Sequence, residues 1–404
     1  MVSRNNVRLV LNVLQQYRKA SRIEISKYSG LSPATVTNVI QELENLGLVR
    51  EAGKTELPMG RKPILIELNP DIQYLVGLDV GIGKIIGVVI NLHSDIIRSI
   101  REEFDVNSDD FDLVHEMEKV YLKLIEGLPQ EIINKIPGVG VSVPGLVHLE
   151  KGVLVFAPNL PNCNNVPLAD KLSQLIGKPV YIENEARAMA LAEARYGAAR
   201  GYKNVFCIRL GYGIGGGIII NGELYRGSSY TAGEVGHMTI LPSGPLCHCG
   251  NRGCLEVFAG GGAIASTALR VLSSGSNSLI REIAEDDSSS ITARVVSEAA
   301  KRGDEIALKI VKDFANYIGI GIASVVNILN PEVIIVGGGV ANTGELLFRE
   351  IKNNVKKRAF TTMMRFPEIL PSMLGEQASS IGVAAYVFEE IIRNHPEYFK
   401  VPKK

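Results

Sequence analysis

The sequence repeats one unit, a strand followed by a glycine-rich turn and a second strand that ends in asparagine. The first copy spans residues 75–91 and the second spans residues 205–221. The turns share one pattern, Gly81-x-Gly83 and Gly211-x-Gly213. This duplication predicts a chain of two related lobes with a cleft between them. Each turn is either a plain hairpin or a loop that presents backbone N–H groups to a phosphate.

Alternating strands and helices continue across residues 75–390 and predict α/β layers. A buried strand at residues 333–336 leads into Gly337-Gly338-Gly339, and an earlier strand ends in Glu183-Asn184-Glu185 before an alanine-rich helix. Ligands bind at the carboxyl ends of strands in such sheets, so both positions are candidates for ligand contact. For Glu183 and Glu185 the alternative is a structural role at the helix start, where acidic side chains favour the helix dipole.

A short segment after the second copy holds a metal-binding pattern. Its residues are His237, Cys247, Cys249 and Cys254. One imidazole and three thiolates suit a structural, tetrahedral Zn²⁺ with no open coordination position. His248 is an alternative fourth ligand, and a chance grouping of loop cysteines is the other explanation. Glu234 and Glu256 flank the ligands, and two carboxylates beside an imidazole are suited to binding the hydroxyl groups of a sugar.

Charge is unevenly distributed along a chain of 404 residues whose formal net charge is zero. Residues 1–70 contain ten Lys or Arg and six Asp or Glu, so a basic end precedes an acidic body. This asymmetry favours a nucleic-acid-facing amino-terminal region. The chain has five cysteines, three of them in the metal pattern, and no signal peptide, so a reducing cytoplasm is expected. No apolar run approaches the roughly 20 residues that span a bilayer.

The first seventy residues predict a helix-turn-helix. Helices are expected at residues 5–17 and 22–29, and a third begins at Pro33 with Ser32 as its N-cap. Apolar residues at helical spacing form the buried face of the third helix, and short polar residues face outward. The residues expected to contact DNA through this helix are Ser32, Thr35, Thr37 and Asn38.

Two strands, at residues 48–51 and 63–68, follow the third helix and predict a wing. The loop between them carries Arg61 and Lys62, which are placed to contact a phosphate or a minor groove. The alternative is a small helical domain that docks on proteins, but the short polar residues and the basic wing favour DNA.

With these features, the chain resembles the ROK family of repressors and sugar kinases over essentially its whole length. The motifs that carry the resemblance are Glu234-x-x-His237, Cys247-x-Cys249, Cys254-x-Glu256, Pro144-Gly145, Glu183-Asn184, residues 210–217 and residues 330–339. The amino-terminal winged helix is a feature of the repressor branch. The resemblance implies a two-lobed, actin-like (ribonuclease H-like) sugar-kinase fold, with a winged helix-turn-helix at residues 1–70, a first lobe at 71–185 and a second lobe with the zinc loop at 186–404. The carboxy-terminal helix can return to the first lobe.

The resemblance also implies contact residues. For a sugar of hexose type they are Asn159, Asn184, Glu185, Glu234, His237 and Glu256. For a vestigial nucleotide site they are Asp79, Gly81, Gly211, Gly213, Gly215 and Gly338. Glu185 also stands at the position of the family's catalytic base.

The departures from the family pattern fall in the nucleotide half. Family kinases have Asp-x-Gly-Gly-Thr in the first phosphate loop, where this chain has Ile82 and Gly83 as the last two residues. Tyr212 replaces the threonine of the second phosphate loop. The catalytic base is usually Asp and is Glu185 here, and its extra methylene moves the carboxylate by roughly 1 Å, which can cost about 10²-fold in rate. A sensor that binds sugar without efficient phosphoryl transfer fits this combination.

The leading hypothesis is a cytoplasmic, sugar-responsive transcriptional repressor with a structural Zn²⁺. Its expected partners are operator DNA, most simply an inverted repeat bound by a homodimer or homotetramer, and a small sugar or sugar derivative; no membrane is expected. The alternative is an ATP-dependent, glucokinase-like sugar kinase with an appended DNA-binding domain, which would use Mg-ATP. A third hypothesis is a docking protein with an inactive kinase body. The sequence leaves the sugar and the operator open.

Overall fold

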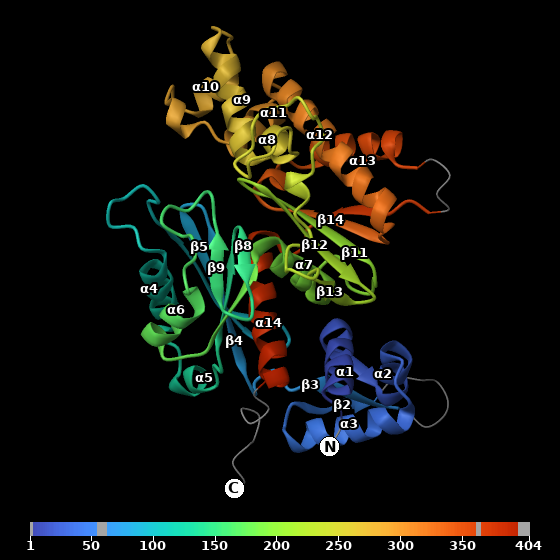
Figure 1. Cartoon of the computed structure of the whole chain (residues 1–404). Helices are drawn as coiled ribbons and strands as arrows, with labels where there is room; N and C mark the ends of the chain where they lie inside the picture. Colours follow the sequence, from blue (N-terminus) through green and yellow to red (C-terminus); the bar gives the residue numbers. More distant parts are fainter. Residues whose placement is uncertain (1–2, 55–62, 361–364, 395–404) are drawn as a thin grey trace. The chain divides into compact units, whose positions relative to one another are not determined.

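The computed structural model describes residues 3–54, 63–360 and 365–394 (Figure 1). The chain divides into two compact units. The first unit contains Met1–Tyr196 and Ser379–Lys404, and the second contains Gly197–Ala378. Among the described residues, every helix is too short or too polar to cross a membrane.

The chain begins with a winged helix. Its helices are α1 (Arg4–Tyr17), α2 (Arg22–Ser29) and α3 (Pro33–Asn45), and its sheet has the order β1-β3-β2, with β1 (Lys19–Ser21), β2 (Val49–Lys54) and β3 (Ile64–Leu68). Local capping sets these boundaries. The side chain of Ser21 accepts a hydrogen bond from the backbone of Glu24, which completes a capping box, and Gly30 ends α2 in the left-handed region. Ser32 caps α3 as predicted. Strand β1 was not predicted.

A mixed five-stranded sheet forms the core of the first unit, in the order β10-β7-β4-β5-β6. Its strands are β4 (Tyr74–Gly81), β5 (Lys84–Asn91), β6 (Ile96–Glu103), β7 (Val139–Val143) and β10 (Val180–Asn184). Strand β5 pairs antiparallel with both β4 and β6, and β7 and β10 run parallel to β4. The remaining elements are α4 (Leu113–Ile125), α5 (Gln130–Asn134), β8 (Leu146–His148), β9 (Val153–Phe156), α6 (Leu168–Ile176), α7 (Glu185–Tyr196) and α14 (Ala378–Asn394).

The last helix of the described chain, α14, returns to pack on this first sheet. A Cβ atom at Gly77 of β4 would lie 1.9 Å from the carbonyl oxygen of Ser380, so the helix backbone touches the strand. A Cβ atom at Gly382 would lie 1.8 Å from the carbonyl oxygen of Ala188 in α7. Only glycine permits these two approaches, and α14 therefore packs against both β4 and α7.

The second unit repeats the sheet of the first. Its strands have the order β13-β12-β11-β14-β15, with β11 (Val205–Leu210), β12 (Ile214–Ile220), β13 (Glu223–Tyr225), β14 (Val333–Gly337) and β15 (Glu368–Pro371). Strand β12 pairs antiparallel with both β11 and β13, and β14 and β15 run parallel to β11. The identical order and directions confirm the predicted duplication and the actin-like fold class.

The remaining elements of the second unit are helices. They are η1 (Val235–His237), α8 (Glu256–Ala259), α9 (Gly261–Ser273), α10 (Leu279–Ile283), η2 (Ser288–Ser290), α11 (Ala293–Lys301), α12 (Glu305–Leu329), η3 (Gly339–Thr343), α13 (Glu345–Arg358) and η4 (Gly375–Gln377). Helix α12 begins at Glu305, where the side chain of Asp304 caps it by accepting a hydrogen bond from the backbone N–H of Ala307.

A buried ion pair joins the end of β10 to the first turn of α7. The Nε atom of Arg187 is 2.7 Å from Oε1 of Glu183, and the two side chains are 2% and 0% exposed. The same carboxylate oxygen accepts a hydrogen bond from the backbone N–H of Asn184 at 2.7 Å. The pair therefore sets the direction in which α7 leaves the sheet.

Replacing one partner tests this anchor. Arg187→Met should lower the free energy of unfolding of the first unit by about 3–5 kcal/mol, because it removes the cation that compensates a buried carboxylate. Urea denaturation measures the effect. Arg302→Ala is the matched control, since Arg302 pairs with Glu298 on the surface at the same i,i+4 spacing and should change stability little. Equal losses in the two variants would contradict the special role of the buried pair.

Candidate functional site

Four side chains of the second unit converge on one point. The ligand atoms of His237, Cys247, Cys249 and Cys254 all lie within 4.8 Å of one another. Nδ1 of His237 is 3.6 Å from the sulfur of Cys247, and the sulfurs of Cys249 and Cys254 are 3.7 Å apart. Atoms placed roughly 2.3 Å from one ion at tetrahedral angles are about 3.8 Å apart. The four residues predicted from the sequence thus form a group that can hold a tetrahedral metal ion.

The loop that carries the cysteines depends on a glycine. Gly253 has a φ of +68°, and a Cβ atom there would lie 1.6 Å from the carbonyl oxygen of Leu241. A β-bridge between Thr239 and Cys254 then holds the loop against the segment that follows His237. The loop therefore brings its cysteines back to the histidine.

The thiol of Cys254 in this group is difficult to ionise. Burial, together with hydrogen bonds to Cys249 and Cys247, raises the pKa of the Cys254 thiol to about 12. At neutral pH this thiol keeps its proton unless a cation displaces it. His248, the alternative fourth ligand, is exposed and lies outside the group formed by the described residues.

Glu256, one of the two carboxylates beside the metal-binding group, is held by the second glycine turn. Its Oε2 atom accepts a hydrogen bond from the N–H of Ile214 at 2.8 Å. A Cβ atom on Gly213 would lie 2.3 Å from that oxygen, so the carboxylate lies directly against this glycine. Helix η1, which begins one residue after Glu234 and ends at His237, also packs against Ile214. The elements that carry the second unit's candidate sugar residues therefore meet around one backbone segment.

Asn184, a candidate sugar residue of the first unit, caps α7. Its Oδ1 atom accepts hydrogen bonds from the N–H groups of Ala186 and Arg187 at 2.9 and 3.3 Å. Its Nδ2 atom donates to the carbonyl oxygen of Gly145 at 3.1 Å. The side chain is thereby fixed in orientation. The supporting Glu183–Arg187 pair was not predicted, although the i,i+4 spacing of opposite charges at a strand end was a signal for it.

The first unit carries two further candidate sugar residues. Glu185 is the first residue of α7, and its carbonyl oxygen accepts a hydrogen bond from Ser379 Oγ at 2.9 Å. Asn159 lies in a turn after β9 and is partly buried. Gly145 connects the two places, because a Cβ atom there would lie 2.1 Å from the carbonyl oxygen of Phe156 at the end of β9.

The first glycine turn is a two-residue β-hairpin loop. Strands β4 and β5 pair as far as Gly81 and Lys84, so Ile82 and Gly83 alone form the loop. The nearby carboxylate of Asp79 is buried and accepts a hydrogen bond from Ser142 Oγ at 2.6 Å.

The second glycine turn lies on the first turn of α9. The N–H groups of Gly261 and Gly262 donate to the carbonyl oxygens of Gly211 and Tyr212 at 2.9 and 3.2 Å. The ring of Tyr212 packs beside Gly262, where a Cβ atom would lie 3.0 Å from its Cζ atom. Helix starts are favourable places for phosphate, but two N–H groups of this one are taken by the turn itself.

Two further glycines, Gly215 and Gly338, are predicted to contact a nucleotide. Gly215 pairs with Arg209 inside β12 and is part of the strand. Gly338 has a φ of +88°, and a Cβ atom there would lie 2.4 Å from the carbonyl oxygen of Leu210. The end of β14 thus meets the end of β11, beside the turn.

The polar side chains predicted to contact DNA lie on the amino-terminal half of α3. Thr35 Oγ1 is 2.8 Å from Ser32 Oγ, and Thr37 donates to the carbonyl oxygen of Pro33 at 2.9 Å. Asn38 is exposed, and within the part of the chain that the structure describes its side chain makes no hydrogen bond. Its carboxamide is therefore available to an external partner.

The predicted wing contacts cannot be placed, since Arg61 and Lys62 lie outside the described residues. The strands that lead to and from them, β2 and β3, pair antiparallel as predicted.

Comparison with known proteins gives two family matches. The profile of the ROK family matches residues 75–390. A profile described as winged helix-turn-helix DNA-binding matches residues 4–50.

Individual proteins match over different lengths. The xylose repressor of Caldicellulosiruptor bescii is 34% identical over 393 residues, which cover 97% of each chain. The glucokinase of Thermotoga maritima is 32% identical, with 78% of this chain and 98% of the glucokinase covered. The crystal structure of a ROK family transcriptional regulator, a homolog of the Escherichia coli MLC protein, has a TM-score of 0.77 and 26% identity, covering 98% of this chain and 97% of that chain.

Proposed function

The chain belongs to the ROK family and is a sugar-responsive transcriptional repressor, and we propose that its effector is the pentose xylose. The length of the similarity supports the repressor assignment, and the identity supports xylose, because the xylose repressor is 34% identical to this chain whereas the Escherichia coli regulators Mlc and NagC are 25% and 27% identical. The xylose repressor matches 97% of this chain, whereas the glucokinase matches 78%. The part of this chain that the glucokinase does not match is about as long as the winged helix. A repressor needs this domain to bind DNA, and a kinase does not.

The kinase alternative has less support. Its phosphate loops would require N–H groups and hydroxyls that face a nucleotide. Tyr212 instead lies on the start of α9, and the loop formed by Ile82 and Gly83 carries no hydroxyl. These features favour a body that binds sugar without efficient phosphoryl transfer.

The proposed sugar contacts are Asn159, Asn184, Glu185, Glu234, His237 and Glu256. Carboxylates and fixed amides suit hydroxyl groups, because they accept or donate in defined directions. The fixed orientation of Asn184 and the carboxylate of Glu256 on its glycine turn support the assignment. The functional division of the chain at residues 70 and 185 stays a prediction.

Helix α7 offers a direct connection between the proposed sugar contacts and the winged helix. It begins at Glu185 and ends one residue after Arg195. Arg195 donates to Oδ1 of Asn12 in α1 at 3.3 Å and forms an ion pair with Glu389 of α14. A sugar that binds one position of α7 better than another would thereby bias the position of α1, which is the condition for a ligand to shift a conformational equilibrium.

We propose that the His237 and cysteine group holds a structural Zn²⁺. Three thiolates and one imidazole leave no open position for catalysis. Such an ion would fix His237 through Nδ1 and leave Nε2 facing other groups.

We propose that the repressor acts in the cytoplasm as a homodimer or homotetramer on an inverted repeat. A two-fold assembly presents two recognition helices to adjacent major grooves, which matches a palindromic site.

Xylose should stabilise the full chain and release it from its operator. A free ligand at one hundred times its Kd adds about 2.7 kcal/mol of stability by mass action, which thermal denaturation detects. Glucose and N-acetylglucosamine are the comparison sugars, and ADP release in the presence of Mg-ATP is assayed for each. Glu234→Gln should abolish the xylose effect while operator binding persists.

If glucose stabilises the chain and releases the operator more than xylose does, the effector is a hexose and not a pentose. That result would leave the repressor function unchanged. Sugar-dependent ADP release at ordinary enzymatic rates would instead support the kinase.

Asn38→Ala should weaken operator binding by roughly 1–3 kcal/mol, because an amide that reads a base is lost. The salt dependence of binding should stay constant, since no phosphate contact is removed. Fluorescence anisotropy with an operator selected from random DNA, measured at several salt concentrations, provides both values. Asn45→Ala, at the exposed far end of α3, is the control and should bind normally. A loss confined to Asn45→Ala would place the recognition surface elsewhere.

The purified protein should contain about one zinc ion per chain, as expected for a closed four-ligand site. Cys254→Ser should remove the zinc and lower the melting temperature, because the loop would lose its cross-link. Cys163→Ala, which changes a buried cysteine of the first unit, should retain zinc and serves as the control. Metal analysis and thermal denaturation are the measurements. Full zinc content in Cys254→Ser would rule out this ligand set.

A further inference from the structure

The turn that joins β5 to β6 in the first unit is built around Asn91, the asparagine that ends the first copy of the repeat. Asn91 is 6% exposed, and its Oδ1 atom accepts hydrogen bonds from the N–H groups of His93 and Asp95, both at 2.9 Å. Its Nδ2 atom donates to Oδ2 of Asp95 at 3.0 Å. The asparagine therefore fixes the turn and the direction of the Asp95 carboxylate, and it leaves Oδ1 of that carboxylate to a group outside the turn.

The corresponding asparagine of the second copy, Asn221, is used differently. It has a φ of +53° and lies with Gly222 in the two-residue loop between β12 and β13. Its N–H group donates to Oδ1 of Asn204 at 3.1 Å, and within the described part of the chain its side chain makes no hydrogen bond. The hydrogen bonds around Asp95 are therefore a feature of the lobe that follows the winged helix and not of the shared fold.

Arg18 of the winged helix contacts this turn. Its Nη2 atom donates to Oδ1 of Asp95 at 3.1 Å and to the carbonyl oxygen of His93 at 3.3 Å. The same turn binds the segment that leaves the winged helix, because the N–H group of Leu92 donates to the carbonyl oxygen of Pro70 at 3.2 Å. The turn between β5 and β6 thus holds the winged helix at the end of α1 and again at its exit.

The backbone of Arg18 is strained. At the C-cap of α1 this residue has a φ of +60° and a ψ of −50°, whereas the ordinary left-handed region lies near a ψ of about +47°. Residues with a Cβ atom rarely adopt such a conformation, which persists where surrounding contacts hold it and is common at switches and binding sites. Glycine would adopt it more readily but would lack the guanidinium group. The strain therefore indicates that the contact with the turn has a function.

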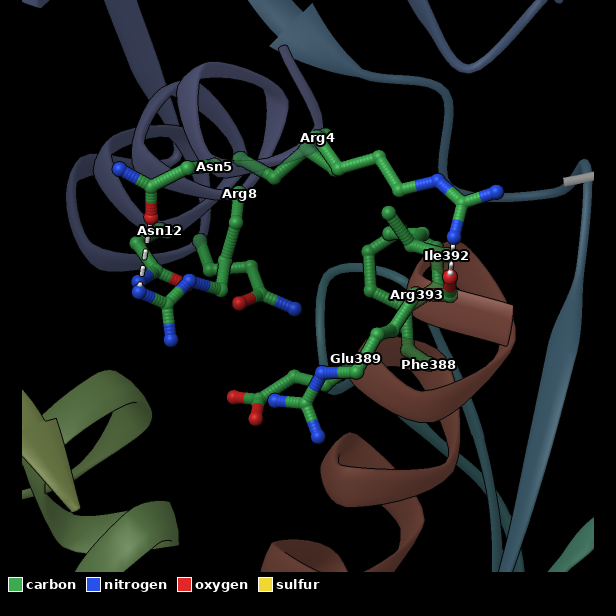
Figure 2. A pocket seen from close by; sticks show the side chains of 10 residues that line it. Arg4, Asn5, Arg8, Asn12, Phe388, Glu389, Ile392 and Arg393 are labelled. Carbon is green, nitrogen blue, oxygen red and sulfur yellow. Dashed lines mark hydrogen bonds between the residues drawn. The ribbon is translucent and has the colours of Figure 1, made fainter. Parts of the chain in front are cut away.

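Two further contacts of α1 with the rest of the first unit are hydrogen bonds beside a cavity. Arg4 donates to the carbonyl oxygen of Arg393 in α14 at 2.8 Å, and Arg195 of α7 donates to Asn12 at 3.3 Å. The cavity, of about 190 Å³, lies between α1 and α14 (Figure 2). A close-packed junction is held by many van der Waals contacts, whereas an open, polar one depends on individual hydrogen bonds. A few side chains therefore decide the orientation of the winged helix.

We propose that Arg18 is a positioning residue that fixes the orientation of the winged helix on the first unit and thereby determines which spacing of operator half-sites the repressor accepts. The proposal rests on the two-fold assembly and the inverted repeat proposed above. Two recognition helices that are held firmly on their bodies reach major grooves at one separation, and this geometry sets the half-site spacing. Winged helices that turn freely would accept several separations.

The contact acts on orientation and not on folding. The side chains of Arg18 and Asp95 are 53% and 50% exposed, and ion pairs between exposed side chains contribute little to the free energy of unfolding. Substitutions at either residue should therefore leave the stability in urea and the thermal stabilisation by xylose unchanged. An altered preference for operator spacing in a variant of normal stability is a result that a purely structural role of the pair would not produce.

Operator binding by the full-chain variants Arg18→Gln and Asp95→Asn tests the proposal. The probes are the operator selected from random DNA, the same operator with two base pairs added between its half-sites, and a single half-site. Two added base pairs turn one half-site by roughly 70° about the DNA axis, which a fixed winged helix does not follow. The wild-type protein should bind the lengthened operator roughly tenfold more weakly, a loss comparable to one mismatched base pair. In both variants this ratio should fall to about threefold or less, while the affinity for the single half-site stays unchanged.

Two further variants assign the effect to this contact. Arg101→Gln, which removes an exposed ion pair with Glu103 inside β6, is the matched control and should keep the wild-type ratio. The double variant Arg18→Gln/Asp95→Asn should change the ratio no more than either single variant, because both substitutions break the same contact. A loss of half-site affinity in Arg18→Gln alone would show that Arg18 contacts DNA directly and would overturn the proposal.

Two other results would also overturn it. One is a wild-type protein that binds the selected and the lengthened operators equally, since its winged helix would then have no fixed orientation. The other is a wild-type ratio that both variants retain. These results leave the repressor function standing, whereas selection of an operator with a single half-site would contradict the proposed two-fold assembly and, with it, this proposal.

Discussion

The ion pair between Glu183 and Arg187 is the interaction on which the first unit's functional parts depend. It closes the junction between β10 and α7 away from water, and its carboxylate also holds the backbone of Asn184. Asn184 then caps α7 and reaches Gly145. Since α7 ends at the contact between Arg195 and Asn12, one buried pair at its start orients a helix that reaches the winged helix at its other end.

In the second unit, the group formed by His237 and three cysteines takes the place of this ion pair. A loop with little secondary structure carries the cysteines, and the proposed Zn²⁺ would hold it against His237. The groups of the neighbouring glycine turn are already in use. The N–H of Ile214 donates to the carboxylate of Glu256, and the ring of Tyr212 packs on the start of α9. A turn used in this way is suited to positioning a sugar contact and poorly suited to receiving a phosphate.

Local features were predictable because neighbouring residues encode them. Ser21, Gly30 and Ser32 set helix ends through hydrogen bonds and backbone angles within a few residues. The group of His237 and three cysteines was predictable for a chemical reason, because one imidazole and three closely spaced thiolates are typical of a metal site and uncommon otherwise. Strand β1 was missed because three residues carry too little periodicity to indicate a strand.

The sequence by itself determined the duplicated α/β fold class, the winged helix and the four residues of the group that could hold a metal ion, because repeats, caps and ligand spacing are local properties. The tertiary structure alone decided that both sheets share one strand order and that α14 packs on β4 and α7. It also decided that Arg4 and Gln15 face Glu389 and Arg393 across a cavity. These residues are separated by most of the chain, and no local pattern links them. Their proximity arises only when the last helix packs against the first sheet, where glycines allow two backbones to touch.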